Sequence, residues 1–308
     1  MTKVAIVAAS GPDVGIGHLR RARRLESAFE PVPGISVSLF DLTATDFRPS
    51  MLDHLGCDVL VLDLPPLLQT AELATILERL RGGGIKVVGI DGPSAGIDLL
   101  VVPSFHVSRE AIAEAQERGA EVLSGWDRLI IDPRTAVAPR GPGAPVLVLT
   151  GGSDATQLGR HLPAFIDARL PEGTAIVWVV GPLAAPPRFP EAPRLQWTEH
   201  RDVADLRPLM HSSGHALAVY GVSVLELLHH GVPTVVLSPY GDRDREHLDI
   251  LEREGLAVTE TDPVRAVEEL GSLVTDPDRS AKIARRAADR VSRPGTDQVV
   301  RDILEYIL

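Results

Sequence analysis

The sequence predicts two α/β domains in tandem, each built on a parallel sheet covered by helices. Apolar runs of strand length alternate with amphipathic helical stretches, and one segment rich in proline and glycine interrupts the alternation. The length of 308 residues agrees with two domains, because an ordinary domain has about 100 to 200 residues. We expect domains at residues 1–132 and 145–308, with residues 133–144 as the linker.

The expected strands of both halves are rich in Val, Leu and Ile and lack polar alternation, which is typical of strands buried on both faces. In the first half they are residues 4–9, 37–40, 59–62, 87–90 and 99–102. In the second half they are residues 146–150, 176–180, 216–219 and 234–237. Ligands of open parallel sheets bind beyond the carboxyl ends of the strands. We therefore look for chemistry in the loops that follow these strands, and expect a cleft between the halves.

Composition excludes several classes of protein. Hydrophobic residues make up 44% and charged residues 24%, as in globular proteins, and the net charge of −11 repels nucleic acid and anionic membranes. The apolar runs are too short for a signal peptide or a spanning helix of about 20 residues. We expect a cytoplasmic protein with no integral membrane segment and no nucleic-acid partner. The single cysteine, Cys57, is expected to be a core thiol.

The loop after the first strand carries Gly15, Gly17 and His18 at the start of an expected helix. Glycines allow close approach of a ligand, and the N–H groups of a helix start favour an anion. A dinucleotide-binding loop would have a third glycine where this chain has Arg20, so we expect no NAD and no other cofactor.

His18 is the candidate general base, because an imidazole can accept a proton near neutral pH. The alternative is a histidine that caps the helix or packs against the other domain. Arg20 is placed to meet an anion, and Arg21 either does the same or lies on a solvated helix face. Asp63 and Asp91 each follow a buried strand, where a carboxylate can orient the histidine, bind sugar hydroxyls or cap the next turn.

In the second half, two loops suit a diphosphate. Gly151, Gly152 and Ser153 follow one strand, and Gly221, Val222 and Ser223 begin a helix that carries Glu226 one turn later. The amides of such turns hold phosphate groups and a carboxylate can hold a ribose diol. The alternatives are a plain tight turn for the paired glycines and dipole compensation for Glu226.

The Asp242-Arg243-Asp244 segment has the spacing with which some sugar-nucleotide enzymes hold a divalent cation. Carboxylates that flank an arginine at the start of a charged helix more often cap it and form salt bridges. We expect no metal, and we place Asp244 on the sugar-binding side.

Together these loops resemble the GT-B glycosyltransferase superfamily, and within it the nucleotide-sugar hydrolases of the PseG and SpsG type, with MurG-like transferases more distant. The resemblance covers nearly the whole chain. The segments that carry it are residues 15–21, 57–63, 89–91 with 97–100, 151–154, and 221–226 with 231–233. It implies His18 as the catalytic base, uridine diphosphate held by the second domain, Glu226 on the ribose, and no metal in catalysis.

The chain departs from these hydrolases where the sugar would be recognised. The hydrolases have Asp-His-Tyr where this chain has Asp63-Leu64-Pro65, and two aspartates where this chain has Asp91-Gly92. Their Tyr-Ala-Leu segment is replaced here by Trp-Asp-Arg-Leu at residues 126–129. We therefore expect an inverting GT-B glycosyltransferase that moves a sugar from a nucleotide donor, UDP in the first instance, to a small or carbohydrate acceptor. The alternatives are a UDP-sugar hydrolase and a non-catalytic nucleotide-sugar-binding partner subunit.

Overall fold

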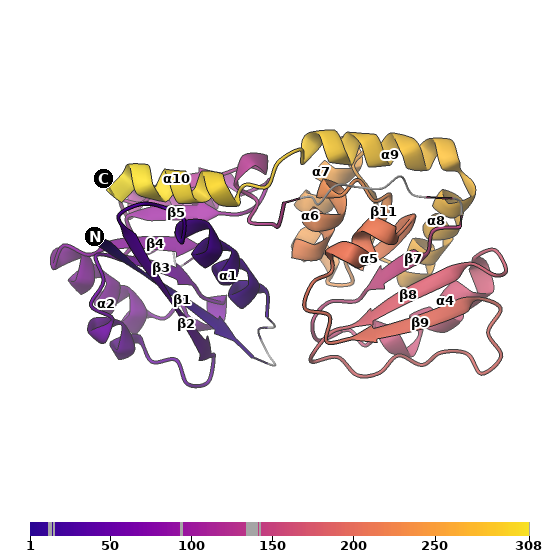
Figure 1. Ribbon diagram of the computed structural model, residues 1–308, viewed down its shortest axis with the longest axis horizontal. Coiled ribbons are helices and arrows are strands. Elements are labelled where there is room, and N and C mark those ends of the chain that lie inside the picture. The colour runs from indigo at the N-terminus through magenta and orange to yellow at the C-terminus, as the bar shows by residue number, and fades with distance from the viewer. Residues whose placement is uncertain (12–13, 15, 93–94, 134–140, 142, 308) are drawn as a thin grey trace. The chain divides into compact units, whose positions relative to one another are not determined.

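The computed structural model describes residues 1–11, 14, 16–92, 95–133, 141 and 143–307. The chain forms two compact units, residues 1–132 with 294–308 and residues 133–293 (Figure 1). The predicted linker falls largely on residues 134–140 and 142, which lie outside the described residues.

The first unit holds a parallel sheet of six strands in the order β2-β1-β3-β4-β5-β6. Its strands are β1 (Thr2–Ser10), β2 (Ile35–Thr43), β3 (Val59–Asp63), β4 (Lys86–Ile90), β5 (Leu99–Val102) and β6 (Glu121–Ser124). Its helices are α1 (Gly17–Phe29), α2 (Ala71–Gly82), α3 (Arg109–Glu117) and α10 (Thr296–Ile307), with short 3-10 turns η1 (Pro49–His54), η2 (Pro66–Leu68) and η3 (Trp126–Arg128).

Two hydrophobic clusters flank this sheet because its strands alternate their side chains between two covered faces. Leu60 and Leu62 of β3 join the cluster under α2, and Val59 and Val61 join the cluster under α1 and α10. Cys57 is half-buried against the first of these clusters, where the sequence predicted a core thiol.

The C-terminal helix α10 belongs to the first unit, which corrects the predicted domain of residues 145–308. Val299, Val300 and Ile303 of α10 are buried in the cluster that also contains Leu25 of α1. The amphipathic sequence of α10 predicts that one face is covered but does not say by which sheet. Figure 1 shows this helix, in yellow, beside β5.

The second unit has a parallel sheet of six strands in the order β12-β11-β10-β7-β8-β9. Its strands are β7 (Val146–Leu149), β8 (Ala175–Val180), β9 (Gln196–Arg201), β10 (His215–Val219), β11 (Thr234–Leu237) and β12 (Val258–Glu260). Its helices are α4 (Leu162–Arg169), α5 (Arg207–Ser212), α6 (Val222–His229), α7 (Arg245–Arg253), α8 (Pro263–Thr275) and α9 (Pro277–Arg290), with 3-10 turns η4 (Leu158–Arg160) and η5 (Gly241–Asp244).

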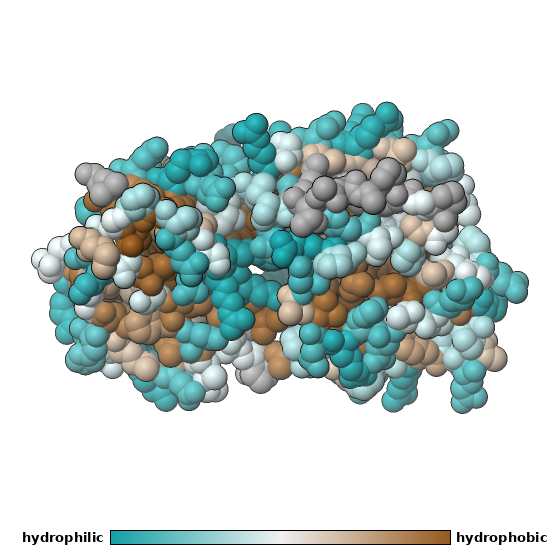
Figure 2. All heavy atoms as spheres, in the orientation of Figure 1, coloured by the Kyte–Doolittle hydropathy of each residue, from teal (hydrophilic) through white to brown (hydrophobic). Residues whose placement is uncertain are grey.

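The core of this unit is built around Trp178 of β8, which is 1% exposed and packs with Leu270 of α8 among other apolar side chains. The outer surface of α9 is hydrophilic (Figure 2), because Ile283 and Ala287 face inward and charged residues, arginines foremost, take most of the other side. No helix in the described part of the chain is both long enough and apolar enough to cross a bilayer.

Candidate functional site

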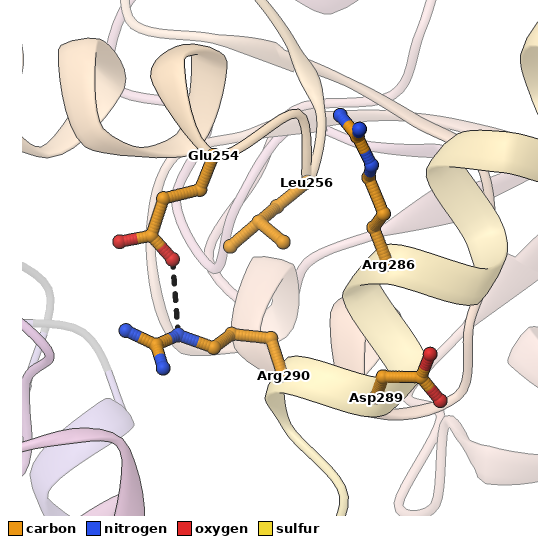
Figure 3. Close-up of a pocket in the computed structure, with 5 residues that line it drawn as sticks. All are labelled: Glu254, Leu256, Arg286, Asp289 and Arg290. Carbon is orange, nitrogen blue, oxygen red and sulfur yellow. Dashed lines mark ion pairs between the residues drawn. The ribbon is translucent and has the colours of Figure 1, made fainter.

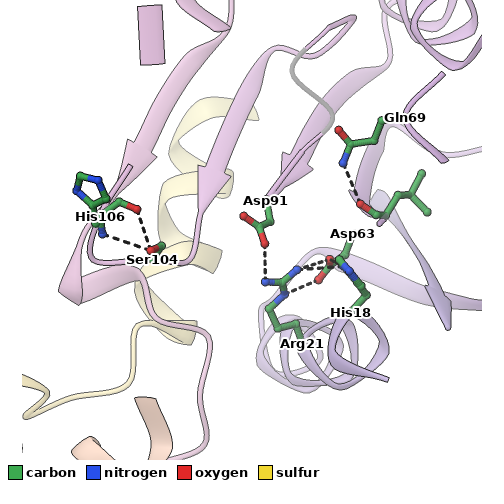
Figure 4. A network of polar contacts seen from close by, with 8 residues as sticks. His18, Arg21, Asp63, Gln69, Asp91, Ser104 and His106 are labelled. Atoms are coloured by element: carbon green, nitrogen blue, oxygen red, sulfur yellow. Dashed lines mark hydrogen bonds and ion pairs between the residues drawn. The ribbon is translucent and has the colours of Figure 1, made fainter. Parts of the chain in front are cut away.

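Four predicted site residues come together at the carboxyl edge of the first sheet (Figure 4). They come from the start of α1, the end of β3 and the loop after β4. His18 lies in the first turn of α1, and its Nδ1 is 2.6 Å from Oδ1 of Asp63, the last residue of β3. Asp63 is completely buried, whereas the side chain of His18 is 17% exposed. The side chains of His18 and Asp63 thus contact each other. This contact differs from the two alternatives, in which His18 caps the helix and Asp63 caps the next turn.

Arg21 holds the same carboxylate from the next turn of α1. Its Nε donates to Oδ2 of Asp63 at 2.9 Å and its Nη2 donates to Oδ1 at 2.7 Å. Its Nη1 donates to Asp91 at 3.1 Å. Burial alone would lower the pKa of Arg21, but the charges and hydrogen bonds of Asp63 and then Asp91 outweigh burial and raise it. The alternative of a solvated Arg21 is therefore wrong, since the residue is only 7% exposed.

The hydrogen bonds of Asp63 favour one tautomer of His18. Both oxygens of Asp63 accept hydrogen bonds from the Arg21 guanidinium, as an ionised carboxylate does. An ionised carboxylate only accepts, so Nδ1 of His18 carries the proton and donates it to Asp63. In that tautomer the lone pair is on Nε2.

Asp91 has a left-handed backbone with φ of 60°, a conformation that aspartate tolerates better than most residues. Its N–H donates to the carbonyl of Val101 on the neighbouring strand at 2.8 Å. The next residue, Gly92, has φ of 122°, and a Cβ there would lie 2.4 Å from the side-chain nitrogen of Gln69. The side chain of Gln69 therefore occupies the space beside Gly92, a contact that the sequence does not reveal.

The other predicted residues of this loop lie on or before α1. Gly17 is its exposed first residue, and Arg20 is half-buried one turn later. Gly15 lies outside the described residues.

In the second unit, the paired glycines after β7 lie against the turn after β8 and are hydrogen-bonded to it. Leu183 donates its N–H to the carbonyl of Gly152 at 2.9 Å, and a Cβ at Gly181 would lie 2.3 Å from the carbonyl oxygen of Gly151. The need for glycine at 181 was missed because the close approach is between distant segments. Ser153 is half-buried in the same turn.

Asp154 caps the turn that follows these glycines. Its carboxylate accepts from the N–H groups of Leu158 and Gly159 at 2.9 and 2.8 Å. Burial raises the pKa of Asp154, and these two hydrogen bonds act in the opposite direction. The N–H groups of Leu158 and Gly159 thus already have an acceptor. The prediction of a diphosphate site stays with residues 151–153 and with the start of α6.

Helix α6 begins after Gly221, which has no side chain to cap the first N–H groups. Val222 and Ser223 form its half-buried first turn. Glu226 lies in the second turn and is 8% exposed. Dipole compensation acts within the first turn, so it does not account for this buried carboxylate.

The loops after β10 and β11 contribute further polar groups at the same edge. The rings of Tyr220 and His247 lie 5.3 Å apart between centroids, a pair that sequence spacing does not reveal. The hydroxyl of Ser238 donates to Asp244 at 2.5 Å, and Nε of Arg245 donates to Asp242 at 2.7 Å. Both carboxylates of the Asp-x-Asp segment are therefore engaged with protein groups. Among the described residues, no group of three His, Cys, Asp or Glu could hold a metal ion.

A hollow of about 510 Å³ lies elsewhere on the second unit (Figure 3). It is lined by Glu254, Leu256, Arg286, Asp289 and Arg290, with Arg290 paired to Glu254 at 2.9 Å. Leu256 precedes β12, so this hollow is at the amino ends of the strands and contains none of the predicted site residues.

Comparison with solved structures identifies the fold. The chain is similar to MurG of Acinetobacter baumannii, with a TM-score of 0.67, 15% identity and 99% of each chain covered. It is similar to the UDP-GlcNAc 2-epimerase of Neisseria meningitidis bound to UDP-GlcNAc, with a TM-score of 0.59, 11% identity, and 98% of this chain and 100% of that chain covered. The spinosyn forosaminyltransferase SpnP matches with a TM-score of 0.61, 13% identity and 99% of each chain covered.

No protein-family model and no curated protein matches the sequence. The chain has the GT-B fold of two Rossmann-like α/β domains, as the sequence predicted.

Proposed function

We propose that the protein is an inverting glycosyltransferase of the GT-B type that uses a nucleotide-sugar donor, with UDP as the expected nucleotide, and a small or carbohydrate acceptor. The observation that carries the proposal is the buried Asp63 carboxylate 2.6 Å from Nδ1 of His18. Two of the fold neighbours support it, because SpnP is a forosaminyltransferase and the Neisseria epimerase was solved bound to UDP-GlcNAc.

In the proposed reaction, Nε2 of His18 takes the proton of the acceptor hydroxyl as its oxygen attacks the anomeric carbon. The bond between that carbon and the diphosphate oxygen breaks, and the nucleoside diphosphate leaves with the electron pair, so the configuration is inverted. The imidazolium that forms is stabilised by Asp63, which Arg21 keeps in place. Amides at Gly151, Gly152, Val222 and Ser223 take the developing diphosphate charge.

Calorimetric titration of UDP, dTDP, CDP and GDP tests the donor site. We expect one nucleotide to bind, with the same affinity in magnesium and in chelator, and Glu226→Ala to weaken it by removing the ribose contact. His18→Ala is the matched control and should bind that nucleotide as the wild type does. If no nucleotide binds at millimolar concentration, the donor proposal is wrong and a non-catalytic partner subunit becomes the better explanation.

Hydrolysis of the donor is a second candidate, because the motif of residues 15–21 resembles nucleotide-sugar hydrolases and His18 can activate water as it activates a hydroxyl. The two reactions differ in the rate of UDP release without acceptor. A transferase releases UDP slowly alone and quickly with its acceptor, whereas a hydrolase turns over at full rate in water. Chromatography of the sugar product would also detect an epimerised sugar, the product expected if the chain acted as the 2-epimerase among its fold neighbours does.

A further inference from the structure

Tyr240 and Arg243 form a pair at the carboxyl edge of the second sheet, in the loop after β11. The guanidinium carbon of Arg243 lies 5.6 Å from the centre of the Tyr240 ring, within the range of a cation–π contact. Tyr240 directly precedes the 3-10 turn η5, and Arg243 is the third residue of that turn. Side chains three positions apart eclipse one another in a 3-10 turn, so the local backbone brings these two side chains together.

The carboxylates on either side of Arg243 are both held by other donors. Nε of Arg245 donates to Asp242 at 2.7 Å, and the hydroxyl of the buried Ser238 donates to Asp244 at 2.5 Å. An arginine between two aspartates would ordinarily pair with one of them. Within the part of the chain that the structure describes, no carboxylate forms an ion pair with Arg243, and its side chain is exposed.

The hydroxyl of Tyr240 is a second donor on the same surface. Tyr240 is 36% exposed, and across the described ranges of the chain its hydroxyl has no hydrogen-bond partner. Burial raises the pKa of this hydroxyl, Arg243 lowers it, and the charges of Asp244 and Asp154 raise it further. The phenol is therefore protonated at neutral pH and can donate. Guanidinium N–H groups and a phenol O–H together form a donor set that suits an oxyanion.

The pair lies beside the turns to which we assign the diphosphate. The strand β11 pairs with β10, and β10 pairs with β7, so the loops after these three strands are neighbours. The N–H of Tyr220 donates to the carbonyl of Leu237 at 2.9 Å, which joins the end of β11 to the loop that starts α6. Asp154, whose charge acts on Tyr240, directly follows residues 151–153 in the turn after β7. These donors are therefore at the edge where the negative charge of a nucleotide is expected.

We propose that Tyr240 and Arg243 bind an oxyanion of the nucleotide-sugar donor, with the guanidinium and the phenol hydroxyl as hydrogen-bond donors. The inference rests on the proposed function and names the charged group by which the second unit recognises its ligand. Two groups share this chemistry, the terminal phosphate of the nucleoside diphosphate and a carboxylate on the sugar. In the second case the donor is the nucleotide derivative of an acidic sugar.

Calorimetry on the full chain tests the proposal, with UDP, UDP-glucose and UDP-glucuronic acid as the probes. We expect Arg243→Gln to weaken binding about fivefold to tenfold, between the effects of an exposed ion pair and of a buried hydrogen bond to a charged group. Arg243→Lys keeps the charge and should lose less. Tyr240→Phe removes one donor and should weaken binding about twofold to fivefold. The control is Arg253→Gln, at an exposed arginine in the last turn of α7, which should bind as the wild type does.

The response of the three probes identifies the oxyanion. Equal weakening of all three by Arg243→Gln assigns the phosphate, whereas weakening of UDP-glucuronic acid alone assigns a carboxylate on the sugar. Added salt should weaken binding to the wild type more than binding to Arg243→Gln, because screening acts on the charge that the variant lacks.

The proposal is overturned if Arg243→Gln binds every probe as the wild type does, or if Arg253→Gln weakens the probes as much as Arg243→Gln. Circular dichroism and thermal unfolding establish that the variants are folded, and Arg243→Lys separates loss of charge from loss of structure. Nucleotide binding that is insensitive to Arg243→Gln contradicts the oxyanion proposal alone. A wild type that binds none of the three probes contradicts the proposed function as well.

Discussion

The carboxylate of Asp63 lies 2.6 Å from Nδ1 of His18, although 45 residues separate them in the chain. Both oxygens of that carboxylate also accept from the Arg21 guanidinium. One buried group therefore receives three hydrogen bonds from a single turn of α1, and it holds the imidazole in one tautomer and one orientation.

Replacing Asp63 by Asn should lower the rate of UDP release by about 10² to 10⁴, the range for loss of general base catalysis. An amide cannot accept from both Arg21 nitrogens and from His18, so the imidazole loses its fixed tautomer. Steady-state kinetics should show the loss in kcat with the KM for the donor nearly unchanged. Asp41→Asn, at an exposed carboxylate paired with Arg23, is the control and should keep full activity. An unchanged kcat in Asp63→Asn would remove Asp63 from the mechanism.

Replacing Arg21 by Met should destabilise the protein by about 3 to 5 kcal/mol, because it leaves the buried Asp63 without its cation. The side chain of Arg23 is 63% exposed and forms only a 3.4 Å contact with Asp41. Arg23→Met should therefore change stability by no more than about 0.5 kcal/mol. Urea denaturation of both variants measures the difference, and equal midpoints would show that the buried pair adds nothing.

Gly295 touches the turn that carries Trp126, and a Cβ there would lie 2.5 Å from the backbone of Arg128. Gly295→Ala should destabilise the protein by about 1 to 3 kcal/mol, since backbone atoms cannot move aside as a flexible side chain can. Gly82, the last residue of α2, has open space where its Cβ would be. Gly82→Ala should be neutral or stabilising by up to about 1 kcal/mol. Thermal unfolding compares the two, and tolerance of both would mean that α10 is loosely held.

Cys57 should react slowly with iodoacetamide. Burial, and secondarily the charge of Asp58, raise the pKa of its thiol, so less thiolate is present at pH 8 than in the unfolded chain. Mass spectrometry should show slower alkylation of the native protein than of the protein in urea, with the native rate rising above pH 9. Because Cys57 is the single cysteine, each added mass reports this residue alone. Fast labelling together with loss of activity would instead identify a nucleophile.

Central strands could be predicted from the sequence more readily than edge strands. The predicted runs at residues 59–62 and 87–90 correspond to β3 and β4, which are buried on both faces and therefore continuously apolar. The strands β6, β9 and β12 were missed. Each lies at an edge of its sheet, and β9 has the polar sequence Gln-Trp-Thr-Glu-His-Arg because only part of it is covered.

The candidate site, too, could be predicted only in part from the sequence. The sequence predicts which loops carry polar groups, because each follows an apolar run. It placed His18 at the helix start after the first strand, and Asp63 and Asp91 directly after buried strands. It left Arg21 undecided, since helical periodicity places a residue on a face of the helix but does not show what charge faces it. The stacking of Phe105 on Trp126 was missed for the same reason, because β5 and β6 had first to be set side by side.

The sequence by itself determined two α/β units and the carboxyl-end loops of their strands, because hydrophobic periodicity is a local property of the chain. Only the tertiary structure decided that α10 returns to the first sheet and that Arg21 is buried between Asp63 and Asp91. The physical reason is that an apolar helix face can cover any sheet of suitable size. The partner of a buried charge, likewise, is set by the order in which strands pair.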